Sequence, residues 1–188
     1  MNPLRETLHF YFRHIMQNST INNALLGGIG VLMVAFIATL SFSLEEHMAM
    51  EGKKAPSFSI QADNGRTITP ANFGGKLLVL NFWATWCQPC VDEVPSLDAL
   101  QRRFAGKGLV VLGVSVDENA NLYKQFLAKN SISFLTVRQP SKQLSQDYGT
   151  FKYPETYLID QSGIVIRKVI GKEDWSDERV ISYVQSLL

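Results

Sequence analysis

The chain has 188 residues, which is enough for one ordinary domain and an additional segment. Its 18 lysines and arginines nearly balance its 17 aspartates and glutamates. These charges are scattered singly along the sequence and form no basic block. The composition therefore gives no support to nucleic-acid binding, which needs a concentrated positive surface.

An apolar segment near the N-terminus interrupts the charge pattern. Residues 14–44 contain no Lys, Arg, Asp or Glu, and from Ala24 to Leu44 (ALLGGIGVLMVAFIATLSFSL) the sequence is apolar apart from small residues and one Thr. As a helix this stretch would extend about 30 Å, the thickness of a bilayer core. It lacks the polar stripe of a helix packed on a globular core. The sequence predicts a transmembrane anchor over 24–44, between a short cytoplasmic tail (1–23) and a tether (45–55).

A cleaved signal peptide is the main alternative for this segment. Signal peptides have a short basic head and an apolar run of about 7–15 residues, whereas both are longer here and no clear A-x-A cleavage pattern follows. Arg5 and Arg13 precede the segment, while Glu45 and Glu46 follow it. The positive-inside rule then favours a cytoplasmic N-terminus and a C-terminal domain outside the cytoplasm, where a disulfide can persist.

Residues 56–188 are expected to form one domain in which apolar runs alternate with amphipathic ones. Strands are expected at 57–61, 67–69, 76–84, 109–116, 131–137, 155–160 and 164–171. Helices are expected after the strand at 76–84, after a cap at 117–119, at 141–149, and from a capping box at Ser176 and Glu178 to the C-terminus. This order predicts an α/β fold with a mixed central sheet flanked by helices.

The stretch NFWATWCQPCVDEVP contains Cys87 and Cys90, the two cysteines of the chain. Cys87 lies where a buried strand ends and a helix begins, and a helix N-terminus stabilises the reactive thiolate. Cys90 follows one turn later, so the two sulfurs can meet. This spacing suits a two-step exchange in which Cys87 attacks a partner disulfide and Cys90 resolves the mixed disulfide.

Other uses of two cysteines fit less well. A structural disulfide that closes so small a loop would restrain the unfolded chain little, and zinc needs about four ligands. A copper site would need a downstream histidine, but His9, His14 and His47 all lie at or before the tether. The peroxiredoxin pattern P-x-x-x-T-x-x-C would meet Leu80 and Ala84. We therefore expect no metal site, and redox exchange through the cysteines needs no dissociable cofactor.

The motifs FWATWCQPC, Glu93-Val94-Pro95 and YPETYLID, taken together, resemble the thioredoxin superfamily. More narrowly, the chain resembles the membrane-anchored, extracytoplasmic TlpA/ResA/DsbE-like proteins from about Pro56 to Leu188. The resemblance implies a thioredoxin-like fold preceded by one N-terminal transmembrane helix. It also implies a thiol–disulfide oxidoreductase in the bacterial inner membrane that faces the periplasm and reduces protein disulfides.

The resemblance assigns roles to two further residues. Pro154 matches the family's cis-proline, which packs against the cysteine pair and offers backbone to the substrate; a trans proline opening a strand is the alternative. Glu93 lies one turn after Cys90, where a carboxylate accepts the proton of Cys90 or raises the thiol pKa. A solvated Glu on the helix surface is the alternative there. Asn81 departs from cytoplasmic thioredoxins, which carry an aspartate at this strand position, so Glu93 is the acid–base candidate.

Substrate contacts are expected from Trp86, which adjoins Cys87, from Pro89, and from Glu155 after the cis-proline. Glu155 matches the P-E-T variant of cytochrome c maturation members, which suggests apocytochrome c, with its C-x-x-C-H disulfide, as a substrate. The resemblance further implies electrons from a transmembrane thiol carrier of the DsbD or CcdA type. An oxidase or isomerase on the same fold and a membrane-anchored copper-binding module are the alternatives.

Overall fold

The computed structural model describes residues 23, 25–41, 49–62 and 65–188, which belong to two compact units, residues 1–46 and 47–188. In the first unit, residues 25–41 are helical and exposed. No helix among the described residues is long and apolar enough to cross a membrane. Ala24 and residues 42–44, the ends of the expected anchor, lie outside the described part of the chain.

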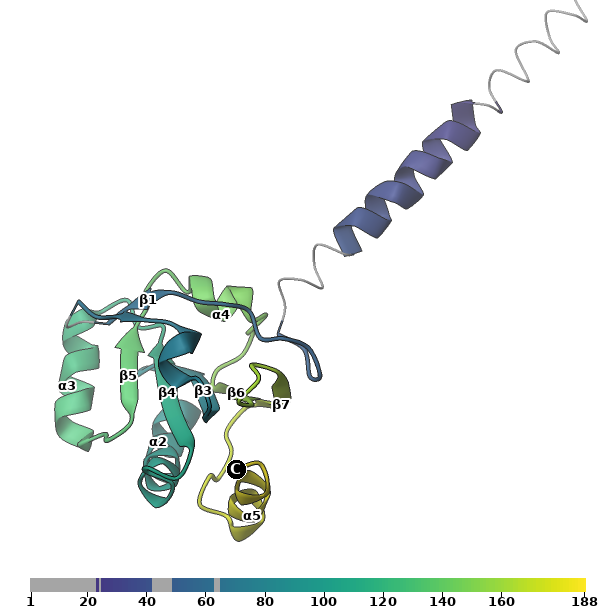
Figure 1. The fold of residues 1–188 in the computed structure, drawn as a ribbon. Helices are drawn as coiled ribbons and strands as arrows, with labels where there is room; N and C mark the ends of the chain where they lie inside the picture. The colour runs from purple at the N-terminus through teal and green to yellow at the C-terminus, as the bar shows by residue number, and fades with distance from the viewer. Residues whose placement is uncertain (1–22, 24, 42–48, 63–64) are drawn as a thin grey trace, which may run out of the picture. The chain divides into compact units, whose positions relative to one another are not determined.

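The second unit is built on a five-stranded sheet with the strand order β5-β4-β3-β6-β7 (Figure 1). The strands are β3 (Leu77–Trp83), β4 (Leu109–Ser115), β5 (Leu135–Arg138), β6 (Glu155–Ile159) and β7 (Val165–Ile170). β3 pairs in parallel with β4 and antiparallel with β6. Every residue of β3 is buried, as expected for the continuous apolar run of a central strand. The mixed sheet expected from the sequence is confirmed.

Helices cover both faces of this sheet. They are α2 (Gln88–Arg103), α3 (Ala120–Asn130), α4 (Gln143–Asp147) and α5 (Glu178–Ser186). Side chains of α2, α3 and α5 share one core cluster, whereas α4 belongs to the cluster on the other face. That second face also carries a small hairpin, β1 (Ile60–Gln61) with β2 (Thr67–Ile68), and a 3₁₀ turn, η1 (Pro70–Phe73). Figure 1 shows α4 and β1 on one side and α2 on the other.

Two element boundaries differ from the sequence expectation. α5 is capped by Asp177, whose Oδ1 accepts from the Arg179 amide at 2.8 Å, and not by Ser176, whose hydroxyl instead donates to Asp174. The strand expected from Ser131 begins at Leu135, because Ser131 ends α3 in the left-handed conformation with φ 47°. The first boundary is set by the side chain that caps the start of α5, and the second by the left-handed residue that ends α3.

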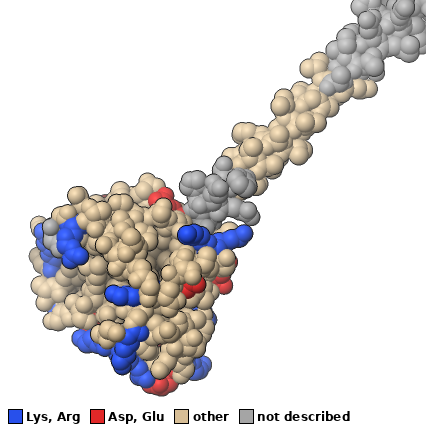
Figure 2. Space-filling view, viewed as in Figure 1, with Lys and Arg blue, Asp and Glu red and all other residues tan. Residues whose placement is uncertain are grey.

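Residues 49–55, which were expected to be part of the tether, lie along the edge of the sheet beside β7. Lys54 forms an antiparallel bridge with Ile164. The Gly52 amide donates to the Val165 carbonyl at 2.8 Å. The segment therefore satisfies backbone groups that an edge strand would leave unpaired. On the visible face of the second unit, lysines and arginines form several small, separate patches with uncharged areas between them (Figure 2).

Candidate active site

The two cysteines form a disulfide at the junction of β3 and α2. Cys87 is the N-cap residue of α2, and its Sγ accepts a hydrogen bond from the Cys90 amide at 3.3 Å. Cys87 is 7% exposed, whereas Cys90 is 1% exposed. Unpaired amides at a helix N-terminus favour a thiolate at Cys87. Cys87 is therefore the more exposed cysteine of the pair, and Cys90 is the more deeply buried one.

An exposed aromatic side chain borders the cysteine pair. Trp86 is 63% exposed, and its ring meets that of Tyr153 edge to face with the centroids 6.1 Å apart. Pro89 is exposed in the first turn of α2, where its missing N–H leaves no hydrogen bond unmade. The Tyr153–Pro154 peptide bond is cis and Pro154 is buried, so the expected cis-proline is confirmed and the alternative of a trans proline is wrong. The substrate contacts expected of Trp86, Pro89 and Pro154 stay predictions.

Glu93 is 1% exposed, so the alternative of a solvated surface carboxylate is wrong. Its Oε1 accepts a hydrogen bond from the indole Nε1 of Trp175, while its buried Oε2 has no hydrogen-bond partner among the described residues. Burial raises the pKa of Glu93 from 4.5 to about 7, because water no longer solvates the charged form. The bond from Trp175 lowers this pKa, and the nearby charge of Glu173 raises it. The carboxyl group can therefore exchange a proton near neutral pH.

Trp175, in the loop between β7 and α5, is a site residue that the sequence reasoning missed. It is fully buried, and its backbone amide donates to Ser96 Oγ at 3.2 Å. Ser96 Oγ in turn donates to the Glu93 carbonyl at 2.9 Å. The loop thus holds Glu93 from both its side chain and its backbone. The sequence offered one signal for this role. Trp175 is a large apolar residue within the polar sequence KEDWSDE, and such a residue is typically buried against another part of the fold.

Glu155 is fully buried on the opposite face of the sheet. Lys168 Nζ lies 2.9 Å from its Oε1, and the Tyr157 hydroxyl donates to the same oxygen. The Lys168 ammonium also lies over the Tyr157 ring, 5.2 Å from its centroid. Burial raises the pKa of Tyr157, so this hydroxyl stays a donor. The carboxylate is enclosed rather than displayed, and its expected contact with substrate stays a prediction.

The central strand β3 carries a buried amide at Asn81. Asn81 donates through Nδ2 to Thr156 Oγ1 at 2.9 Å. Because an amide does not titrate, this position offers no acid or base. Glu93 is the buried carboxyl group on the α2 side that has a raised pKa.

Asp117 is a second residue whose role the sequence did not reveal. It was expected to help cap a helix, but Asn119 caps α3 and Asp117 is buried against the loop before Cys87. Its carboxylate accepts from the Thr85 amide at 3.0 Å, and from Thr85 Oγ1 and Ser115 Oγ at 2.6 Å each. Asp117 therefore fixes the turn that presents Trp86 and Cys87.

The described part of the chain contains no group of three or more His, Cys, Asp or Glu side chains placed to hold a metal ion. The three histidines, His9, His14 and His47, lie outside the described residues. The copper-binding alternative is therefore left to a titration of the reduced protein.

Comparison with known proteins places the chain in a family. Residues 51–168 match the model of the AhpC/TSA family. The thiol-disulfide oxidoreductase ResA of Bacillus cereus is 32% identical, covering 78% of this chain and 83% of the relative. The thiol:disulfide interchange protein DsbE of Pseudomonas aeruginosa is 34% identical, covering 74% and 78%. A solved thiol:disulfide interchange protein of Chlorobium tepidum superposes with a TM-score of 0.61 at 27% identity, covering 72% and 97%.

The fold, the disulfide at the helix N-terminus and these matches define a thioredoxin-like thiol–disulfide oxidoreductase. The chain belongs to the AhpC/TSA family and is similar to its ResA and DsbE relatives. Leu80 and Ala84 stand where the peroxiredoxin pattern requires Pro and Thr. The chain therefore differs from the peroxidases that use this pattern.

Proposed function

We propose that this protein is a membrane-anchored, extracytoplasmic reductase of protein disulfides that works through Cys87 and Cys90. The observation that carries the proposal is the disulfide between the more exposed Cys87 and the more deeply buried Cys90, one helical turn before the Glu93 carboxyl group. The names of the ResA and DsbE relatives support thiol–disulfide exchange in general. The direction of electron flow and the location belong to the proposal.

In the first step, the Cys87 thiolate of the reduced protein attacks one sulfur of the substrate disulfide. A mixed disulfide forms between Cys87 and the substrate, and the other substrate sulfur leaves as a thiolate that takes a proton from solvent. The amides at the N-terminus of α2 stabilise the attacking anion. Trp86 beside Cys87 and the backbone at Pro154 are positioned to bind the polypeptide that carries the disulfide.

In the second step, the Cys90 thiol loses its proton and attacks Cys87 Sγ. The Cys87–Cys90 bond forms, the bond to the substrate breaks, and the second substrate thiolate leaves, so two electrons have passed to the substrate. Cys90 is buried, and a buried thiol ionises only with a base at hand. Glu93 follows it by one helical turn, and a carboxyl group with a pKa of about 7 is a far better base than an ordinary glutamate.

The reduced state must be restored by a second thiol donor, because the reaction leaves the protein oxidised. We propose a transmembrane thiol carrier of the DsbD or CcdA type as this donor, and the C-x-x-C-H disulfide of apocytochrome c as a substrate. The P-E-T sequence that ends in Thr156, with Glu155 next to the cis-proline, supports the substrate assignment. No dissociable cofactor takes part, because both electrons travel on the cysteines.

Membrane anchoring rests on the sequence, in which residues 14–44 lack any charged side chain and 24–44 are apolar. Two arginines before this segment favour a cytoplasmic N-terminus.

Alkaline extraction of membranes tests the proposed membrane anchoring. The full chain should stay in the pellet, and a chain that starts at residue 49 should be released. Recovery of a soluble protein whose mass lacks the first 44 or so residues would instead establish a cleaved signal peptide.

The chemistry is tested with two single substitutions and a disulfide-bonded peptide that contains C-x-x-C-H. Cys90→Ser should accumulate a mixed disulfide on Cys87 that dithiothreitol releases, because the resolving thiol is missing. Cys87→Ser should form no adduct and reduce no substrate, although Cys90 is present. A Cys87→Ser protein that still reduced the peptide would overturn the mechanism.

A further inference from the structure

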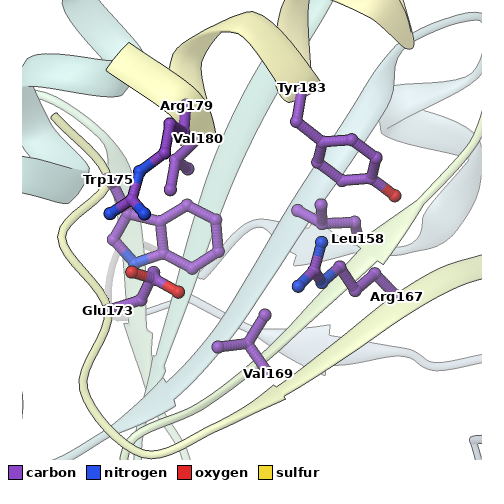
Figure 3. A pocket seen from close by; sticks show the side chains of 8 residues that line it. All are labelled: Leu158, Arg167, Val169, Glu173, Trp175, Arg179, Val180 and Tyr183. Atoms are coloured by element: carbon purple, nitrogen blue, oxygen red, sulfur yellow. The ribbon is translucent and has the colours of Figure 1, made fainter. Parts of the chain in front are cut away.

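A cleft of about 290 Å³ lies between β7, α5 and the loop that joins them, apart from the exposed side of the disulfide. Figure 3 shows Trp175 and Glu173 on one side, Arg167 and Tyr183 on the other, and Val180 and Val169 above and below. Together with Leu158, the two valines give the cleft an apolar lining between two aromatic rings. Its volume is close to the lower end of the range of small-molecule sites.

The two arginines that line the cleft differ in their partners. Arg179 is paired with Asp177 at 3.0 Å and faces solvent. Arg167 forms no ion pair with any described residue, and its guanidinium stacks over the Tyr183 ring, 5.2 Å from the centroid. Figure 3 shows this guanidinium turned toward the middle of the cleft. Glu173 on the opposite side carries the one negative charge of the lining, so a single anionic group is best placed at Arg167 and a second would be repelled.

The wall of the cleft is also part of the active site. Trp175 lines the cleft with its ring and donates its indole N–H to the Glu93 carboxylate. The charged groups that act on Glu93 come from the same loop, Glu173 and Lys172, while Cys90 lies one turn away on α2. Anything that fills the cleft therefore touches the residue that holds Glu93.

We infer that this cleft binds a small monocarboxylate with a flat apolar body, and that its occupancy acts on Glu93 through Trp175. The carboxylate pairs with Arg167 in a charge-assisted, fork-like contact that a planar guanidinium favours. The flat body contacts the half-buried side chains of Val169 and Val180, and the buried Trp175 forms the floor of the cleft. The effect on Glu93 rests on the proposed function, but the binding does not.

The binding test uses 2-naphthoate as the probe and the full chain in lipid nanodiscs, labelled with 5-fluorotryptophan. The chain has three tryptophans, so ¹⁹F NMR gives three signals, which Trp86→Phe and Trp175→Phe assign. Naphthoate should shift the Trp175 signal saturably and leave that of the exposed Trp86 in place. Arg167→Gln should weaken binding about tenfold, as expected for one lost hydrogen bond to a charged group.

Three controls make this result specific. Lys124→Gln removes an equal charge from exposed α3 at the other end of the sheet and should leave the affinity unchanged. Neutral 2-naphthamide should bind at least about tenfold more weakly than naphthoate. Val180→Trp fills the cleft and should abolish the shift. Equal binding of the amide, unchanged binding by Arg167→Gln, or a shift that never saturates would each overturn the site.

The coupling is tested separately by the pH dependence of peptide reduction, with and without saturating naphthoate. A bound carboxylate adds negative charge to the cleft, where the charge of Glu173 already raises the pKa of Glu93, so the midpoint should move to higher pH, and Glu93→Gln should remove the response. Superimposed profiles would overturn the coupling. If the protein reduced no peptide at all, the proposed function would fail while the NMR titration would still decide the site.

Discussion

Two fully buried carboxylates lie close to the disulfide region on opposite faces of the sheet, and their surroundings differ. Glu93 on α2 is held by the neutral indole of Trp175 and keeps one oxygen without a hydrogen-bond partner among the described residues. Glu155 on β6 likewise has an Oε2 without a hydrogen-bond partner among the described residues, but its Oε1 has the Lys168 ammonium at 2.9 Å and the Tyr157 hydroxyl. Glu93 belongs with the core under α2 and α5, and Glu155 with the core under α4.

The difference shows that the partner, and not burial alone, decides what a buried carboxylate does. A cation within ion-pair distance compensates a buried negative charge, so Glu155 can serve as a fixed part of the fold beside the cis-proline. Glu93 forms no ion pair with any described residue, and burial raises its pKa to about 7. This raised pKa lets a proton come and go on Glu93 at neutral pH, which is what the resolving thiol needs.

The largest expected effect comes from removing the cation. Lys168→Met should lower the free energy of unfolding by about 3–5 kcal/mol, because it leaves the buried Glu155 carboxylate uncompensated. Urea denaturation monitored by circular dichroism measures this loss. The double variant Lys168→Met/Glu155→Gln should recover most of it. Unfolding of Lys168→Met at the same urea concentration as the unsubstituted protein would show that the pair is not what holds Glu155.

Glu93→Gln should raise the free energy of unfolding at neutral and higher pH, whereas Lys168→Met lowers it. The folded pKa of about 7 lies above the unfolded value of 4.5, so the folded protein binds more protons and loses stability as the pH rises between these values. Compared with Glu93→Gln, the unsubstituted protein should be less stable by about 3 kcal/mol at pH 8, and this difference should vanish below pH 4.5.

The same substitution should slow resolution of the mixed disulfide by about a hundredfold, because the proton acceptor for Cys90 is gone. Denaturation at several pH values and stopped-flow kinetics measure the two effects. A stability difference that stays constant with pH, or resolution at the original rate, would contradict the assignment of Glu93.

A smaller change is expected from Trp175→Phe. The indole hydrogen bond lowers the pKa of Glu93, so its loss should raise that pKa and move the midpoint of the pH–rate profile for disulfide reduction to higher pH. Trp83→Phe, which changes a buried indole on β3 whose ring neighbours are Tyr123 and Phe126 of α3, is the matched control. A midpoint that moved equally in both variants would point to a general loosening of the core.

The smallest effect is expected at an exposed pair. Arg103 and Glu178 lie 3.4 Å apart at the surface between α2 and α5. Arg103→Gln should change the free energy of unfolding by less than about 1 kcal/mol, because solvent screens such pairs. Urea denaturation of Arg103→Gln and Lys168→Met under the same conditions compares their losses in free energy of unfolding. Comparable losses in the two variants would mean that burial of the ion pair is not the source of its importance.

The sequence predicts the parts of this molecule that depend on neighbours along the chain. The apolar run of β3, the helix that follows it and the placement of Cys87 and Cys90 between them all follow from local patterns. Trp175 could not be predicted, since it meets Glu93 across 82 residues and no local pattern records that contact. The Lys168–Glu155 pair depends likewise on the register of β6 with β7.

The reduction potential of the Cys87–Cys90 pair, measured on the full chain equilibrated in thiol buffers at pH 7, tests the account most directly. The two steps proposed here require a reduced pair that gives its electrons to protein disulfides. The account predicts a potential near that of thioredoxin, about −270 mV. A value near that of a strong oxidant, about −120 mV, would reverse the electron flow and make the protein a donor of disulfides.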